Sequence, residues 1–198
     1  PTGAGLLLRA GSGLIRRMDS VKQGGRVLVI SASVGAGHNQ AARAVVDRLR
    51  EAGPHLEVEH VDALNFAGPC FRAWYAGGYA LAVSRLSRMY GLGFRMTDHP
   101  DGPRRSLAER RRLWTERLAM RRMSKHILAG RYDLILHTHF LVGPMVARMQ
   151  DRGLLSCPQA VVVTDNVIHR YWHSANMERW FLSAELDVER LVRWGIGR

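Results

Sequence analysis

An unbroken apolar run near the N-terminus, followed by a turn of small residues, constrains the fold of this chain most. The run is Arg26–Ser31 (RVLVIS), and the turn ASVGAG leads from it to His38. Such a run is typical of a parallel strand that is covered on both faces. Residues 39–52 then show helical apolar spacing, a glycine–proline pair ends it, and residues 56–62 alternate like a strand. The first 62 residues therefore predict a β-α-β unit and a parallel sheet.

The same rhythm of strand and helix returns in the last third of the chain. We expect strands at 133–139, 159–164 and 179–184 and helices at 141–152 and 184–194. The predicted fold class is therefore α/β, a Rossmann-like parallel sheet flanked by helices. Residues 1–25, rich in glycine and basic residues, are expected to form a flexible leader, and residues 26–198 the domain.

A basic, aromatic insertion is expected at about residues 63–128. Residues 63–97 contain no Asp or Glu, and residues 104–125 carry nine basic residues and two acidic ones. A cationic helix with Trp and Leu on its other side suits an anionic bilayer surface. The same pattern also fits a solvated helix whose apolar stripe packs on the domain. The predicted membrane-facing residues are Trp74, Arg110, Arg111, Arg112, Trp114, Arg121 and Arg122.

Composition narrows the class of protein and of partner. The chain has 198 residues, 29 Lys and Arg against 17 Asp and Glu, and a net charge of +12, which favours polyanionic partners. No RNA-reading or helix-turn-helix motif accompanies that charge, so we do not expect nucleic acid as the partner. The two cysteines, Cys70 and Cys157, argue against a disulfide scaffold and a cysteine zinc site, and they suit a reducing cytosol.

The turn before the first helix is the first candidate site. Backbone N–H groups and the positive helix end can face an anion there, and Gly35, Ala36 and Gly37 leave room for one. The loop lacks the Gly-Lys-Ser/Thr of a P-loop and the third glycine of the dinucleotide fingerprint, although Asp62 keeps a nicotinamide site as a weaker alternative. His38 lies at the carboxyl edge of the sheet, where it could act as a general base or merely cap the helix.

A polar cluster follows the strand predicted at 159–164. Its candidate residues are Asp165, His169 and Trp172. They belong to the same edge of the sheet as the glycine-rich turn, so they can face it across a cleft. Asp165 and two histidines four apart, His169 and His173, suggest zinc together with His137 and His139, but the spacing is loose and we expect no metal. Contacts to a hydroxylated substrate are favoured, with His139 near the site and His137 hydrogen-bonded within the fold.

Three segments in this order resemble the N-terminal half of the monogalactosyldiacylglycerol synthase and processive diacylglycerol glucosyltransferase family. Residues 29–42 are similar to its glycine-rich Gly-His loop, and residues 132–139 (YDLILHTH) to its Pro-Asp-x-Ile-x-x-Thr-His strand. Residues 163–172 are similar to its Thr-Asp…His…Trp segment, and the likeness covers about 26–197. The family implies a GT-B fold of two Rossmann-like domains with the active site between them. The expectation is therefore an acceptor domain, with the C-terminal nucleotide-sugar domain absent from this chain.

The resemblance also implies an activity. The family transfers a hexose from a UDP-sugar to diacylglycerol with inversion, which needs a base on the acceptor side. His38 is the residue expected for that base, and the glycine-rich turn would face the diphosphate of the donor. The acceptor-binding residues expected are His139, Asp165, His169 and Trp172. No cofactor is implied beyond the UDP-sugar substrate, and the expected location is peripheral, on the cytoplasmic face of an anionic membrane.

Two alternatives stay open at this point. The chain could be a related GT-B domain acting on another lipid-linked acceptor, or a non-catalytic basic module that binds membrane or nucleic acid. Donor selection would lie in the second domain, so the sequence favours neither galactose nor glucose. By the resemblance the chain alone is expected to be incomplete for catalysis.

Overall fold

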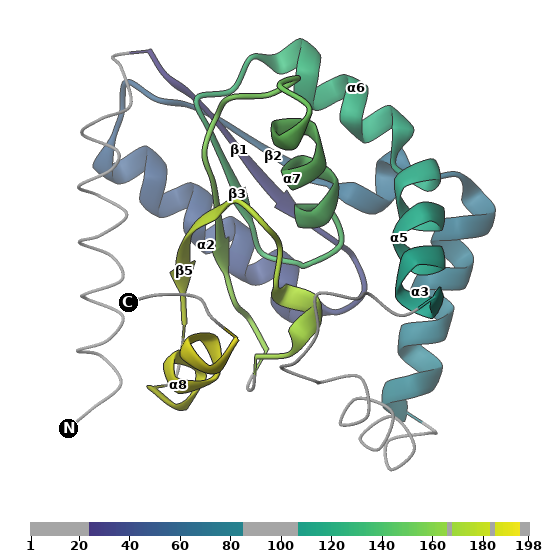
Figure 1. Cartoon of the computed structure of the whole chain (residues 1–198). Coiled ribbons are helices and arrows are strands. Elements are labelled where there is room, and N and C mark those ends of the chain that lie inside the picture. Colours follow the sequence, from purple (N-terminus) through teal and green to yellow (C-terminus); the bar gives the residue numbers. More distant parts are fainter. Residues whose placement is uncertain (1–23, 85–106, 166–167, 183–184, 195–198) are drawn as a thin grey trace.

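The computed structural model describes residues 24–84, 107–165, 168–182 and 185–194, and within them five parallel strands form one sheet (Figure 1). The strands are β1 Arg26–Ser31, β2 Glu57–Asp62, β3 Leu134–His137, β4 Gln159–Val162 and β5 Met177–Phe181. Their order in the sheet is β2-β1-β3-β4-β5, and each neighbouring pair is parallel. The α/β, Rossmann-like prediction is confirmed.

Helices surround this sheet. The elements are α2 Ala36–Ala52, η1 Ala63–Phe66, α3 Pro69–Ser84, α5 Leu107–Ala119, α6 Arg121–Gly130, α7 Gly143–Asp151, η2 Arg170–Trp172 and α8 Glu185–Arg193. Alternate residues of β1 explain why both faces are covered: Val27 and Val29 pack with Leu49 of α2, whereas Leu28 and Ile30 pack with α6 and α7. Among the described helices, none is long and apolar enough to cross a bilayer.

The expected leader and insertion lie partly outside this description. Residues 1–23 and 85–106 are not among the described residues. In the described part, η1, α3, α5 and α6 lie between β2 and β3, which is where the sequence predicts the basic insertion.

The basic segment predicted as one helix at 104–125 is divided into two. The backbone of Met120 leaves helical geometry, with φ −92° and ψ 16°, between the end of α5 and the start of α6. The side chains of Met120, Met123 and Ile127 are buried in the core beside the sheet. Helical spacing in the sequence does not predict this break. The break accompanies the burial of Met120 and of the apolar α6 side chains against the sheet.

The strand order defines a switch point at the carboxyl edge of the sheet. β1 pairs with β2 on one side and with β3 on the other. The chain therefore adds β2 to one side of β1 and all later strands to the opposite side, which makes the boundary between β1 and β3 the switch point of the sheet. In open α/β sheets the crevice at the carboxyl ends of two such strands is where ligands bind. The turn that leads to His38 follows β1, and Thr138 and His139 follow β3.

We predict that His137 makes the fold acid-sensitive. Burial lowers its pKa from the ordinary 6.5 to about 4, and its Nε2 lies 3.0 Å from Oε1 of Gln159. Between these two pH values the unfolded chain binds a proton that the folded chain does not. Stability is therefore fully present above pH 6.5 and is lost as the pH falls toward 4, by up to about 3 kcal/mol.

The measurement is the free energy of unfolding against pH in urea titrations. His137→Gln should flatten the acid side of that curve, whereas the matched variant His55→Gln, at an exposed histidine, should leave it unchanged. Equal slopes for the wild-type chain and His137→Gln would contradict the prediction.

Candidate functional site

His38 is fixed at the carboxyl edge of the sheet by groups from two neighbouring strand ends. Its side chain is 5% exposed, and Nδ1 lies 3.0 Å from the carbonyl oxygen of Thr138 and 2.6 Å from Oγ1 of Thr164. The Thr138 hydroxyl donates to the backbone carbonyl of His38 at 3.0 Å. Thr138 follows β3 and Thr164 follows β4, so the ring position depends on the parallel order of β1, β3 and β4.

These contacts determine which nitrogen of the neutral His38 ring carries the proton. The carbonyl of Thr138 can only accept, so Nδ1 is the protonated nitrogen and the lone pair is on Nε2. Within the described residues, no group hydrogen-bonds to Nε2. The ring thus presents an available proton acceptor.

A second imidazole packs edge-on against the first. The ring centroids of His38 and His139 are 4.6 Å apart, with an interplanar angle of 80°. Burial, and secondarily the charge of His38, lowers the pKa of His139 well below its ordinary value, so this ring is neutral. The backbone N–H of Leu141 donates to Nδ1 of His139 at 3.1 Å, which leaves the proton on Nε2. The pair therefore combines an acceptor nitrogen on His38 with a donor N–H on His139.

The segment after β4 closes the same site. Trp172 is 1% exposed, and its ring centroid lies 6.3 Å from the centroids of both His38 and His139. Its indole N–H donates to Oδ2 of Asp165 at 2.7 Å, so the carboxylate orients the indole. His169 is buried, and its Nδ1 accepts the backbone N–H of Tyr171 at 3.1 Å as the cap of η2.

Aromatic residues extend the site toward the basic elements. Phe140 stacks on His139 with a centroid distance of 4.2 Å, and Tyr75 of α3 lies 6.1 Å from the same ring. Trp74, next to Tyr75 in the chain, is 62% exposed. The two imidazoles thus connect through α3 to an exposed indole.

The structure adds four residues to the sequence prediction of the site. They are Thr138, Thr164, Tyr75 and Phe140. Two of them carried a usable signal, because Thr138 and Thr164 immediately precede the predicted His139 and Asp165 at the ends of strands. Tyr75 and Phe140 carried none, since their approach depends on how α3 and the β3–α7 loop fold over the sheet.

The glycine-rich turn is open beside His38. Gly35, Ala36 and Gly37 are exposed, and a Cβ added at Gly37 would meet no atom within 4 Å. The first turn of α2 has no acidic residue, and no side chain caps its N-terminus. The amide end of α2 therefore carries an uncompensated positive partial charge.

Asp62 is engaged within the protein. Its carboxylate accepts from the backbone N–H of Ser33 at 3.2 Å and from that of Leu64 at 2.9 Å, and it also accepts the Ser33 hydroxyl. These bonds tie the glycine-rich turn to the end of β2. They leave the nicotinamide alternative without the free carboxylate that it requires.

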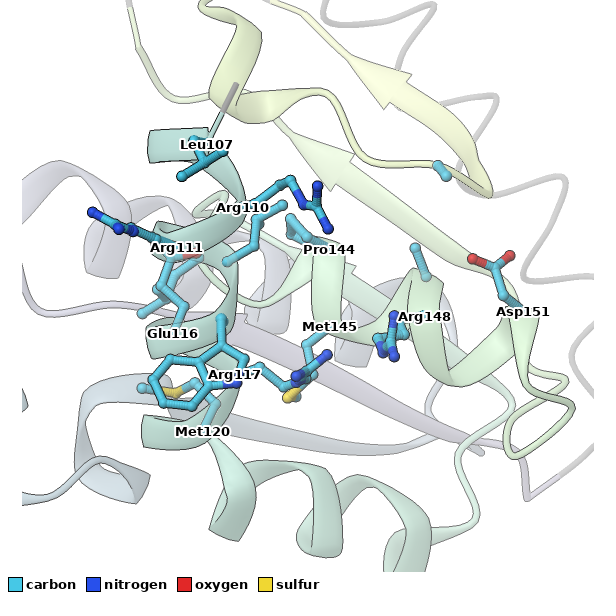
Figure 2. Close-up of a pocket in the computed structure, with 15 residues that line it drawn as sticks. Leu107, Arg110, Arg111, Glu116, Arg117, Met120, Pro144, Met145, Arg148 and Asp151 are labelled. Carbon is cyan, nitrogen blue, oxygen red and sulfur yellow. The ribbon is translucent and has the colours of Figure 1, made fainter. Parts of the chain in front are cut away.

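A groove of about 1150 Å³ lies between α5 and α7, and we call it the α5–α7 groove. Figure 2 shows the residues that line it. Arg110 and Arg117 of α5 and Arg148 of α7 lie around it, with Trp114 and Met145 among its apolar lining. The nearby Arg152, together with Arg117, lowers the pKa of Arg148, which shows that positive charges crowd there. Arg111 lines it as well, and so do two carboxylates: Asp151, which acts electrostatically on Arg148, and Glu116, which pairs with Arg112. The groove is cationic and partly apolar.

The predicted membrane-facing residues differ in their placement. Trp74, Arg110, Arg111, Trp114, Arg121 and Arg122 are exposed. Arg112 instead turns inward: its side chain is 22% exposed and pairs with the buried Glu116. Of the predicted acceptor residues, His139 and Trp172 contact His38, whereas Asp165 and His169 hold the segment that carries Trp172.

In the described part of the chain, no group of three or more His, Cys, Asp or Glu side chains is arranged to hold a metal ion.

Comparison with known proteins relates this site to one family. The model of the family described as monogalactosyldiacylglycerol (MGDG) synthase matches residues 38–198. A processive diacylglycerol beta-glucosyltransferase of Staphylococcus haemolyticus (strain JCSC1435) is 24% identical over 181 residues, which cover 89% of this chain and 42% of the relative. Proteins of the same name from Staphylococcus epidermidis and Staphylococcus aureus are 22% identical, with the same two coverages. The chain thus spans less than half the length of these relatives, and no solved structure matches it.

We predict opposite tautomers for the two histidines of the site. At a pH well above the ordinary histidine pKa of about 6.5, His38 should be protonated on Nδ1 and His139 on Nε2, because of their backbone partners. Long-range proton–nitrogen NMR correlations of the labelled chain measure this, with His38→Gln and His139→Gln spectra for assignment. A proton on Nε2 of neutral His38 would contradict the geometry.

Proposed function

Because this chain belongs to the monogalactosyldiacylglycerol synthase family, we propose that it is the acceptor-binding part of a glycosyltransferase that acts on diacylglycerol. The donor in this proposal is a UDP-hexose held largely by a second domain, in a GT-B arrangement. The observation that carries the proposal is the free Nε2 of His38 at the switch point of the sheet, beside the N–H of His139 and the indole of Trp172.

His38 acts as the base in the proposed reaction. Its Nε2 removes the proton of the glycerol hydroxyl as that oxygen bonds to the anomeric carbon of the sugar. The bond from this carbon to the diphosphate breaks on the opposite side, so the configuration inverts and UDP takes the electron pair. The carbonyl of Thr138, which accepts from Nδ1, stabilises the resulting imidazolium, as a buried acceptor does for the histidine of hydrolase triads.

The surrounding groups bind the acceptor. The Nε2–H of His139 is a donor for a glycerol oxygen, and its neutral state keeps a second positive charge away from the base. The ring of Phe140, packed against the buried Trp172 that Asp165 holds, forms an apolar wall suited to the start of an acyl chain. Asp165 and His169 act on the acceptor through the position of this wall.

The open end of α2 faces the leaving diphosphate. Its free amides and uncompensated partial charge favour an anion, and the exposed Gly35, Ala36 and Gly37 allow close approach. Negative charge develops on the diphosphate as the glycosidic bond breaks, so an anion site there lowers the barrier.

The acceptor stays in the bilayer, so the enzyme must bind the membrane surface. The α5–α7 groove and the exposed Trp74 and Trp114 give arginines and indoles for an anionic headgroup layer. Tyr75, beside Trp74, contacts the His139 ring, and this contact supports a membrane surface next to the site. The proposed location is peripheral, on the cytoplasmic face.

The first test of this function is the loss of His38. The chain is fused to the C-terminal part of the Staphylococcus haemolyticus relative, and hexose transfer from UDP-glucose and UDP-galactose to diacylglycerol is measured. His38→Ala should lower the rate by at least about 100-fold, because a positioned base contributes that much. His55→Ala, at an exposed histidine, should have no effect. Transfer by His38→Ala at the wild-type rate, or a wild-type fusion that transfers no hexose to diacylglycerol, would contradict the proposal.

The second test concerns the groove. Arg117→Gln with Arg148→Gln should weaken binding of the full chain to phosphatidylglycerol vesicles by about 10- to 30-fold, since each surface arginine contributes about 1 kcal/mol. The matched variant, Arg43→Gln with Arg50→Gln on α2, removes the same charge from exposed positions of another helix and should have little effect. Vesicle sedimentation at low and high salt measures both.

Two outcomes would count against this membrane contact. Equal losses in the two double variants would indicate diffuse charge, and equal binding to phosphatidylcholine vesicles at high salt would remove the electrostatic account. Tighter binding to duplex DNA than to vesicles would favour the non-catalytic nucleic-acid module instead.

A further inference from the structure

Arg112 differs from its neighbours on the basic helix α5. Arg110 and Arg111 are exposed, whereas the Arg112 side chain is only 22% exposed. It lies on the helix that forms one wall of the α5–α7 groove, but it faces the segment that closes the His38 site. Its contacts therefore connect two parts of the molecule to which the proposed function gives separate roles.

The Arg112 guanidinium is held on two sides. Its Nη1 donates to both carboxylate oxygens of Glu116, at 2.8 and 3.0 Å. Its Cζ lies 4.4 Å from the centroid of the Tyr171 ring, in a cation–π contact. Burial raises the pKa of the 5%-exposed Glu116 carboxyl above its ordinary value, and Arg112 opposes that rise. Nε of Arg112 is buried and has no hydrogen-bond partner among the described residues, which indicates a packed guanidinium.

Tyr171 belongs to the short turn η2, which also carries Trp172. Its ring lies 5.7 Å from Phe140 and 4.5 Å from His169. Phe140 in turn stacks on His139 at 4.2 Å. Ring contacts thus continue from Arg112 of α5 to the imidazoles of the site.

We propose that Arg112 is a positioning residue that fixes η2 to α5, and with it the buried Trp172 that supports the Phe140 wall of the acceptor site. Glu116 sets the direction of the guanidinium, and the planar guanidinium clamps Tyr171. The consequence is that the helix of the cationic groove and the acceptor wall behave as one body. The effect of Arg112 on acceptor binding rests on the proposed function, whereas the attachment of η2 to α5 does not.

The choice of arginine is part of the inference. A lysine at this position would keep a positive charge near Glu116, but an ammonium does not present a flat face to an aromatic ring. Arg112→Lys therefore removes the clamp with little change of charge. Arg111→Lys makes the same change at an exposed neighbour and is the matched control.

The first measurement is amide hydrogen exchange of the full chain, followed by mass spectrometry. In Arg112→Lys, residues 168–173 should exchange about 10-fold faster, the size expected for loss of a partly buried cation–π contact. Arg111→Lys should match the wild-type chain, and Tyr171→Phe, which keeps the ring, should match it too. Tyr171→Leu should reproduce Arg112→Lys. Unchanged exchange in β1 and β3 shows that the fold persists in each variant.

The second measurement is kinetic and uses the fusion protein described above. Arg112→Lys should raise the KM for diacylglycerol about 10-fold while leaving kcat and the KM for the UDP-hexose unchanged, because it loosens only the acceptor wall. Equal exchange at 168–173 in Arg112→Lys and Arg111→Lys would overturn the clamp. Faster exchange with an unchanged acceptor KM would overturn its role in acceptor binding. A wild-type fusion without transfer would contradict the proposed function, and the exchange data would still decide whether Arg112 holds η2.

Discussion

The bond between Nδ1 of His38 and the carbonyl of Thr138 is the interaction on which the site depends. It joins the start of α2 to the end of β3, and Thr164 adds the end of β4. A backbone carbonyl can only accept, so the carbonyl of Thr138 favours the tautomer of His38 that is protonated on Nδ1. The strand order β2-β1-β3-β4-β5 brings these ends together and directs the lone pair of Nε2 away from them.

Two regions of the molecule differ in burial and in charge: the site around His38 and the α5–α7 groove. Around His38 and His139 the groups are buried and largely uncharged, which suits proton transfer and an apolar wall. On the α5–α7 groove the arginines are crowded and outnumber the two lining carboxylates, Glu116 and Asp151, which suits an anionic surface. Arg112 is part of α5, which lines the groove, but its guanidinium contacts Tyr171 beside the His38 site. The proposed clamp thus gives a physical route by which the membrane helix and the acceptor wall keep one geometry.

Much of the fold could be predicted from the sequence, because it depends on short-range patterns. The apolar run at 26–31 matches β1, and the alternation at 56–62 matches β2 to within one residue. The break at Met120 could not be predicted, since 104–125 has helical spacing throughout and only packing against the sheet divides it.

The site was predictable to a similar extent. His38, His139 and Trp172 follow strands in familiar motifs, and the structure brings their rings together. The orientation of Arg112 was not predictable, because it is one of three consecutive arginines. Only its pairing with Glu116 and its contact with Tyr171, far away in the sequence, distinguish it from Arg110 and Arg111.

The most direct measurement of the central claim is the position of a bound acceptor. A crystal structure of the chain with a short-chain diacylglycerol, soluble enough to saturate the site, would give the distance from its free hydroxyl to Nε2 of His38. The account predicts about 3 Å, since a base must be within hydrogen-bond reach of its proton, with the first carbons of an acyl chain against Phe140. A glycerol bound elsewhere, with Nε2 of His38 facing solvent or protein alone, would contradict it.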